Sequence, residues 1–244
     1  MLWFEHDLFD QLLLIRTLDV LVPGEPRAGE HGFVSLICIG EFPGVDRFIG
    51  LGQLTAEQLA SLYPVRQRVT DEQFALARAA WRAFRSADPR GFADMMHADT
   101  HALPFLAGAI QRLFEEYPST ANGLSWTRHA ILRALSAGPL DAMDLFRVTQ
   151  QEEARPFLGD CGFFDMLRDL SKGRHALVTI APDRPSLDLR GSIVSITDTG
   201  RDVLERRSDA VVLNGIDEWR GGVHLEGDHR SPWRWDAGAK TLVS

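Results

Sequence analysis

The chain has 244 residues, of which 45% are hydrophobic and 25% are charged, and its formal net charge at neutral pH is −8. This length allows one or two domains with a sizeable core, and the composition is ordinary for a globular protein. The negative net charge excludes a basic field over the whole surface, but it leaves room for a local basic patch. Two cysteines, Cys38 and Cys161, are too few for a disulfide framework, which favours the reducing cytoplasm. No apolar run approaches the roughly 18 residues of a membrane span, so we predict no membrane partner.

The first residues have the order strand, helix, strand. Residues 1–5 are apolar, residues 7–21 repeat apolar side chains at helical spacing, and residues 33–39 are apolar and β-branched. This order predicts a βαβ unit with two parallel strands and a right-handed crossover. Two parallel strands do not make a stable sheet alone, so we expect upstream strands to be missing, or later segments or a second chain to complete the sheet. An open sheet edge also favours a homodimer.

Residues 54–122 are predicted to form a helical extension. Two capping-box patterns, beginning at Thr55 and Thr70, each stand ahead of an apolar periodic run. We therefore expect this segment to be helical up to a polar linker at 118–123, which marks a domain boundary.

Residues 123–210 have the element order of a winged helix. The pattern predicts helices at 126–137, 140–150 and 159–170, strands at 176–180 and 191–196, and a last helix from Thr197 to Arg206. This order is typical of a helix-turn-helix variant. The tail, residues 211–244, holds three of the six tryptophans and is expected to dock on the body as short strands. The predicted class is α+β: an abbreviated parallel α/β unit (1–53), the helical extension, a winged-helix-like domain and a tryptophan-rich docked tail.

Acidic side chains follow both predicted parallel strands. Glu5, His6, Asp7 and Asp10 follow the first strand, and Glu41 follows the second. Because the carboxyl ends of parallel strands meet at one sheet edge, we expect Glu41 to face the turn at Glu5 to Asp7. Carboxylates and an imidazole in one crevice suit acid–base catalysis or the binding of a divalent metal. The structural alternative is that Asp7 and Asp10 only cap the helix and complement its dipole.

Basic residues gather near the predicted wing. A winged helix places its third helix in the major groove of DNA and its wing on the backbone. The basic residues here are Lys172, Arg174, Arg184 and Arg190, and they are the candidate nucleic-acid contacts. The predicted third helix, however, carries three aspartates between 160 and 169, and phosphate binding needs a basic face. A protein partner therefore remains an alternative to nucleic acid.

Two further motifs, a histidine pair and a cysteine, are candidate sites, but we predict no metal and no cofactor from them. His97 and His101 have the spacing of a metal-binding pair on a helix, but no third ligand is in sight, which favours a solvated loop. Cys161 lies near a predicted helix start, where a thiolate is favoured, but its aromatic neighbours favour a buried and inert thiol.

Several longer strings, spread over the whole chain, resemble those of one family. They are LWFEHDLFDQ (2–11), SLICIGEFPG (35–44), LGQLT (51–55), PSTANGLS (118–125), FLGD (157–160) and LNGID (213–217). The chain resembles a bacterial family catalogued only as a domain of unknown function (number 1835). The resemblance implies an additional α/β stretch before the first string, which this chain lacks, and it implies no activity.

Together these patterns favour a noncatalytic regulatory or interaction protein of the cytoplasm. Its winged helix would contact a nucleic acid or a protein partner. The alternative is an enzyme, or a small-ligand or metal-binding protein, that uses the acidic strand-end crevice. The second reading depends on whether Glu5 and Glu41 face each other.

Overall fold

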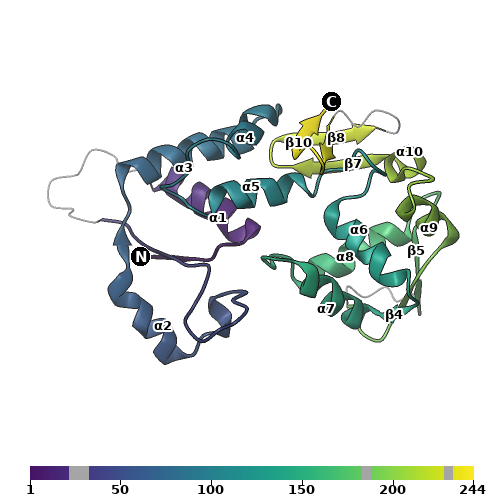
Figure 1. The fold of residues 1–244 in the computed structure, drawn as a ribbon, viewed down its shortest axis with the longest axis horizontal. Helices are drawn as coiled ribbons and strands as arrows, with labels where there is room; N and C mark the ends of the chain where they lie inside the picture. Colours follow the sequence, from purple (N-terminus) through teal and green to yellow (C-terminus); the bar gives the residue numbers. More distant parts are fainter. Residues whose placement is uncertain (22–32, 183–187, 228–232) are drawn as a thin grey trace. The chain divides into compact units, whose positions relative to one another are not determined.

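The computed structural model describes residues 1–21, 33–182, 188–227 and 233–244. Over these residues the chain is a mixed α+β protein with ten α-helices and several small sheets (Figure 1), which confirms the predicted class at that level. The chain divides into two units, residues 1–112 and residues 113–244. None of the described helices combines the length and the apolar character that a membrane span requires.

The first unit is built on a three-stranded sheet in the order β1–β2–β3. Its elements are β1 (Leu2–Phe4), α1 (Leu8–Val20), β2 (Ser35–Cys38), α2 (Ala56–Leu62), β3 (Gln67–Arg68), α3 (Asp71–Phe84) and α4 (Arg90–Asp94). Helix α5 (Leu106–Phe114) begins in this unit and ends just after its last residue. β1 and β2 are parallel, with Leu2 opposite Leu36, so the predicted βαβ order is confirmed. The two capping boxes are also confirmed, since the hydroxyls of Thr55 and Thr70 each accept a bond from the third helical N–H.

The prediction of an all-helical extension is wrong at β3. Gln67 and Arg68 pair antiparallel with β2, with Ser35 opposite Arg68. A later segment therefore supplies the third strand, which was one of the alternatives left open for completing the sheet. Both β3 residues are polar and exposed, so the segment carries no apolar alternation that would mark it as a strand.

The second unit combines three helices with a three-stranded antiparallel sheet in the order β4–β6–β5. These elements are α6 (Trp126–Leu135), β4 (Leu140–Asp141), α7 (Ala142–Glu152), α8 (Asp160–Ser171), β5 (Val178–Ala181), β6 (Ile193–Ile196) and α9 (Asp198–Leu204). Each helix and strand predicted between 126 and 206 is present in the described residues, except that 140–141 form β4 instead of beginning a helix. The elements share one core, to which Leu135, Leu145, Phe163, Leu167, Val178, Val194 and Val203 each contribute a buried side chain.

The tail forms a helix and two hairpins. Its elements are α10 (Ala210–Asn214), β7 (Ile216–Arg220), β8 (Val223–Gly227), β9 (Arg234–Asp236) and β10 (Thr241–Val243). Helix α10 has no counterpart in the sequence prediction. The tail tryptophans differ in burial: Trp235 is 3% exposed and stacks on Phe114, whereas Trp219 is 63% exposed. The backbone of Trp235 also accepts a bond from Thr120 and donates one to Pro118, which joins the tail to the segment at 118–123.

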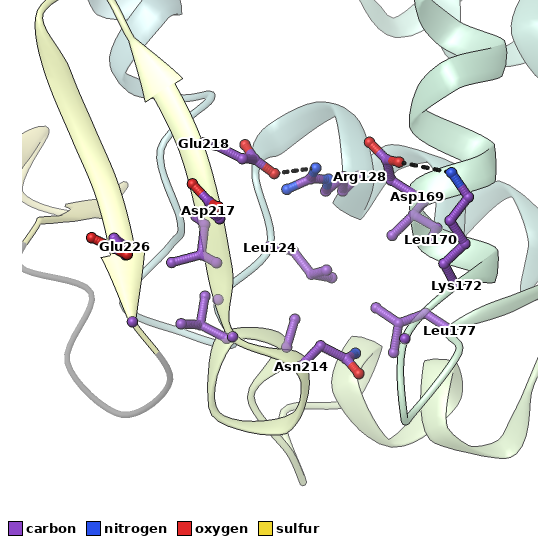
Figure 2. Close-up of a pocket in the computed structure, with 17 residues that line it drawn as sticks. Leu124, Arg128, Asp169, Leu170, Lys172, Leu177, Asn214, Asp217, Glu218 and Glu226 are labelled. Atoms are coloured by element: carbon purple, nitrogen blue, oxygen red, sulfur yellow. Dashed lines mark hydrogen bonds and ion pairs between the residues drawn. The ribbon is translucent and has the colours of Figure 1, made fainter.

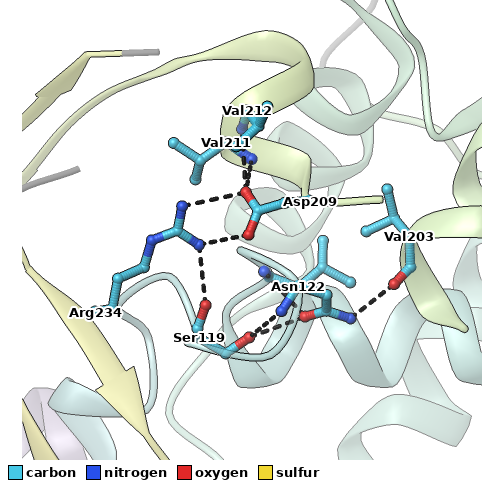
Figure 3. A network of polar contacts seen from close by, with 8 residues as sticks. Ser119, Asn122, Val203, Asp209, Val211, Val212 and Arg234 are labelled. Atoms are coloured by element: carbon cyan, nitrogen blue, oxygen red, sulfur yellow. Dashed lines mark hydrogen bonds and ion pairs between the residues drawn. The ribbon is translucent and has the colours of Figure 1, made fainter. Parts of the chain in front are cut away.

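A polar network fixes this join (Figure 3). The Asp209 carboxylate accepts the backbone N–H groups of Val211 and Val212, at 2.9 and 3.0 Å, and so caps α10. The same carboxylate pairs with Arg234 at 2.7 Å, and Arg234 also donates to the carbonyl of Ser119. Gly123 packs directly against Asp209, since a Cβ on Gly123 would lie 2.6 Å from a carboxylate oxygen. Asp209 therefore connects a helix start, a strand and a loop.

Replacing Asp209 by alanine should destabilise the second unit. The change removes the helix cap and leaves the mostly buried Arg234 without its carboxylate, which together should lower the free energy of unfolding by about 2–4 kcal/mol. Urea unfolding, followed by the fluorescence of the buried Trp235, measures the loss. The matched control is Asp202→Ala, which breaks the exposed ion pair with Arg207 and should cost less than about 1 kcal/mol. Equal losses in the two variants would contradict a special role of Asp209.

Candidate functional site

The carboxylates of the strand-end cluster are held by backbone N–H groups. Glu5 accepts the N–H of Leu51 at 2.6 Å, and Asp10 accepts the N–H of Glu5 at 2.6 Å. Asp7 is the N-cap of α1 and accepts the N–H of Asp10 at 2.9 Å. These bonds fix the turn between β1 and α1, which agrees with a structural role for Asp7 and Asp10 at the start of the helix.

His6 lies in an aromatic environment. Its side chain is buried, and its ring centroid is 5.9 Å from the rings of both Phe48 and Phe105. Gly40 approaches the Cβ of His6 so closely that a Cβ on Gly40 would lie 3.1 Å away. The imidazole is thus packed as part of the first unit's interior.

Gly40, which directly precedes Glu41, lies against His6 at this turn. Glu41 is exposed, and among the described residues it makes no hydrogen bond or ion pair with Glu5, His6 or Asp7. The Glu5 carboxylate accepts the backbone N–H of Leu51, and the chain after β2 forms a short bridge between Phe42 and Val45. The described part of the chain contains no group of three or more His, Cys, Asp or Glu side chains that could hold a metal ion.

Burial nevertheless perturbs the acid groups at this turn. Burial raises the pKa of Asp7 to about 6, with Asp10 and Glu5 adding to the rise, and burial also raises the pKa of Glu5. Nearby, burial raises the pKa of the Cys38 thiol to about 11, so Cys38 stays protonated. The protonated thiol donates weakly to the carbonyl of Glu5, at 3.7 Å. A carboxyl that titrates near neutral pH is the one feature of this turn that suits acid–base chemistry.

Replacing Asp7 by asparagine should stabilise the protein above pH 6. The pKa of Asp7 is higher in the folded chain than the ordinary 3.8, so the folded state is favoured while Asp7 is protonated, and stability is lost as the pH rises from about 4 to about 6. Asparagine keeps the cap acceptor without the charge, so the variant should gain up to about 3 kcal/mol over the wild type above pH 6 and nothing near pH 4. Thermal unfolding across this pH range measures the difference. The exposed Asp71→Asn serves as the control, and a gain that does not change with pH would contradict the assignment.

Two of the four predicted nucleic-acid contacts, Lys172 and Arg190, have carboxylate neighbours. Lys172 lies 3.6 Å from Asp169, and Arg190 lies 2.7 Å from Asp160 and 3.4 Å from Asp188. Arg174 is exposed and forms no ion pair within the described residues. Arg184, the remaining candidate, lies outside the residues that the structure describes.

The two further motifs have no catalytic or metal-binding geometry. The His101 ring bonds to Asp99 at 2.8 Å and lies 3.3 Å from Glu72, and the segment from 97 to 101 is not helical. The prediction that Cys161 is buried is wrong, since its side chain is exposed in the first turn of α8. Its neighbour Phe163 lies on the opposite, buried side of this helix, so the apolar character of the string belongs to the inner face alone.

A cavity of about 610 Å³ lies within the second unit, between α8, α10 and the β7–β8 hairpin (Figure 2). Leu124, Leu170 and Leu177 form an apolar surface in it, and charged side chains stand at its rim. Asn214 closes one side by bonding both backbone groups of His175, each at 2.9 Å. The sequence gives no sign of this cavity, because its walls come from distant segments.

One ion-pair group dominates this cavity's electrostatics. Glu218, on β7, pairs with both Arg128 and Arg220, and all three side chains are largely buried. Burial alone would raise the pKa of Glu218, but the two guanidinium groups hold it below its ordinary value. This group ties β7 to α6 and fixes one wall of the cavity.

Comparisons of the chain with protein-family models, with curated proteins and with solved structures give no match.

Proposed function

We propose that this chain is a noncatalytic regulatory or interaction protein, in which residues 123–210 act as a winged-helix domain that contacts a protein partner. The order of α6, α7 and α8, followed by the β5–β6 hairpin and a closing helix around one core, supports the winged-helix assignment. The fold type alone does not specify the partner, so the partner is argued from surface charge.

The ion pairs that basic residues form at α8 and the wing favour a protein partner over a nucleic acid. Affinity for DNA and RNA comes largely from cations that neutralise phosphates and release their counterions. Lys172 and Arg190 each have a carboxylate beside them, which a phosphate would have to displace. A protein partner does not need such a basic face, so this surface fits protein contact better than nucleic-acid contact.

We also propose that the chain is related to the family of unknown function and that it is located in the cytoplasm. Both Cys38 and Cys161 are free thiols, which suits a reducing compartment. The strings that carry the resemblance run through both units, so the proposed kinship concerns the whole chain.

The alternative, an enzyme or ligand-binding protein, would use the turn at Glu5 to Asp7. The raised pKa of Asp7 favours it. The exposed position of Glu41 and the engagement of Glu5 with the backbone of Leu51 weigh against it. On this alternative, Glu5→Gln would abolish ligand binding and leave the fold intact.

Nucleic-acid titrations test the proposal directly. We expect labelled duplex DNA and single-stranded RNA to show no anisotropy change with this protein, even at a low salt concentration of about 50 mM, because Lys172 and Arg190 already have carboxylate neighbours. Binding that weakens steeply with salt, and that is lost when Lys172, Arg174 and Arg190 are reversed to glutamate, would replace the protein partner with a nucleic acid.

We also propose that the chain forms a homodimer through the first unit. Among the described residues β1 pairs only with β2, so its outer edge is open, and Phe9, in the first turn of α1, is 59% exposed. Light scattering over a range of protein concentrations should show a dimer, and Phe9→Glu should shift it toward the monomer. A wild-type monomer at high concentration would contradict this arrangement.

A further inference from the structure

A smaller pocket, of about 230 Å³, lies within the second unit. It forms where the loop at 118–125 and the start of α6 meet the end of α9 and the β9–β10 turn. It shares only Leu124 with the lining of the cavity in Figure 2, so the two are separate sites. The side chains of its lining that are aromatic, charged or titratable are those of Glu115, Trp126, His129, Arg206, Trp235 and Lys240.

One backbone carbonyl holds Arg206 beside the loop that forms a wall of this pocket. The carbonyl of Val203, in α9, accepts the side-chain amide of Asn122 at 2.9 Å and the backbone N–H of Arg206 at 3.0 Å. The Asn122 side chain is itself held by the hydroxyl of Ser119, at 2.9 Å (Figure 3). The position of Arg206 at the pocket is therefore set by the backbone and not by its side chain.

The β9–β10 turn brings Lys240 to the same pocket. The backbone N–H of Trp235, on β9, donates to the carbonyl of Pro118 at 2.8 Å, which ties the hairpin to the loop. The Asp236 carboxylate accepts the N–H groups of Gly238 and Ala239, each at 2.9 Å, and so fixes the turn that precedes Lys240. The walls are thus held by bonds that leave both cationic side chains unused, as in a preformed binding site.

The pocket has an excess of positive charge in a chain whose net charge is −8. Arg206 and Lys240 are exposed, and neither side chain forms a hydrogen bond or an ion pair within the described residues. Glu115 is the one carboxylate that the described residues contribute to the lining. Burial lowers the pKa of the half-buried His129, and the charges of Arg133 and Arg206 lower it further, which shows that Arg206 lies near this imidazole.

The backbone of both cationic residues has an uncommon conformation. Among the described residues, only Arg206 and Lys240 are non-glycine residues with a positive φ, at 62° and 50°. This left-handed region is crowded for a residue with a Cβ, and Arg206 follows the end of α9 where glycine is the usual choice. Long cationic side chains therefore stand at two positions where glycine would fit with less strain. Residues held in this way gather at ligand sites, and these two line the same pocket.

The shape of the lining specifies the rest of the guest. The volume of about 230 Å³ is below the roughly 300–1,000 Å³ of sites for drug-sized ligands, so the guest is small. Leu124 and Trp235 are almost fully buried, whereas Trp126 is half-buried and offers an indole surface that a guest can reach. A guanidinium group matches a carboxylate, because both are planar and can form two parallel hydrogen bonds.

We propose that this pocket binds a small aromatic carboxylate. The carboxylate of the guest is held by Arg206 and Lys240, and its ring packs on Trp126. The lining contains none of Lys172, Arg174 and Arg190, so this is a small-ligand site in addition to the proposed protein contact at α8 and the wing.

Calorimetric titration of the full chain at low salt tests the assignment with three probes. 1-Naphthoate has both the ring and the charge, 1-naphthamide has the ring alone, and acetate has the charge alone. We expect 1-naphthoate to bind, and each of the other two to bind at least about tenfold more weakly. A wild type that binds 1-naphthoate no more tightly than 1-naphthamide would overturn the assignment, and so would a wild type that does not bind 1-naphthoate at all.

The deciding variant is Arg206→Gly with Lys240→Gly. It removes both cations and places glycine where the backbone already has a positive φ, so the melting temperature should stay the same or rise. Binding of 1-naphthoate should nevertheless weaken at least about tenfold. If the glycine variant melts at a lower temperature, Arg206→Gln with Lys240→Gln removes the same charges without adding backbone freedom, and it should show the same loss of affinity.

The matched control is Arg78→Gln with Arg147→Gln. Both control residues are exposed and lie outside the pocket, so the same charge is removed elsewhere and the affinity should stay within about twofold. Equal weakening in the control and in the pocket variants would overturn the assignment, because it would reflect only the net charge of the chain. The nucleic-acid titrations do not depend on these residues, so a failure here is distinct from a failure of the proposed function.

Discussion

The second unit depends on the hydrogen bonds and the ion pair that the Asp209 carboxylate forms. This carboxylate caps α10, pairs with Arg234 of β9 and packs against Gly123, so three segments far apart in the sequence meet at one group. α10 leads directly into β7, and both elements form walls of the cavity between α8 and the hairpin. Asp209 therefore helps to hold these two walls, and the apolar lining of the cavity, Leu124, Leu170 and Leu177, belongs to the core of the unit.

The first unit shows how one set of acidic residues serves structure at an electrostatic cost. Glu5, Asp7 and Asp10 satisfy backbone N–H groups that burial would otherwise leave without an acceptor. Burial disfavours the charged forms of Glu5 and Asp7, which is why the pKa of Asp7 rises to about 6. The perturbed pKa of Asp7 is thus explained by its structural role, and Glu41 is exposed and forms no ion pair within the described residues.

Local signals explain which parts of the fold are predictable from the sequence. Helices that begin at Thr55, Thr70 and Thr197 have their caps and their apolar stripes within one stretch of chain, and the structure confirms each start. The two-residue strands β3 and β4 have no such signal, because they exist only through pairing with β2 and β6. The cavity is harder to predict from the sequence than these strands are. Its lining residues lie between Gly123 and Gly227, and only the folded chain brings them together.

The position of a charged residue in the sequence does not show whether that charge is paired in the folded chain. Counted along the chain, the basic residues near the wing suggest a surface for phosphates, but in space Lys172 and Arg190 already have carboxylate neighbours. The charges without a Lys or Arg neighbour in the described part of the hairpin are instead the carboxylates of Asp217 and Glu226, beside an exposed tryptophan. Nucleic-acid binding at the wing would therefore compete with the carboxylates of Asp169 and Asp160 for Lys172 and Arg190.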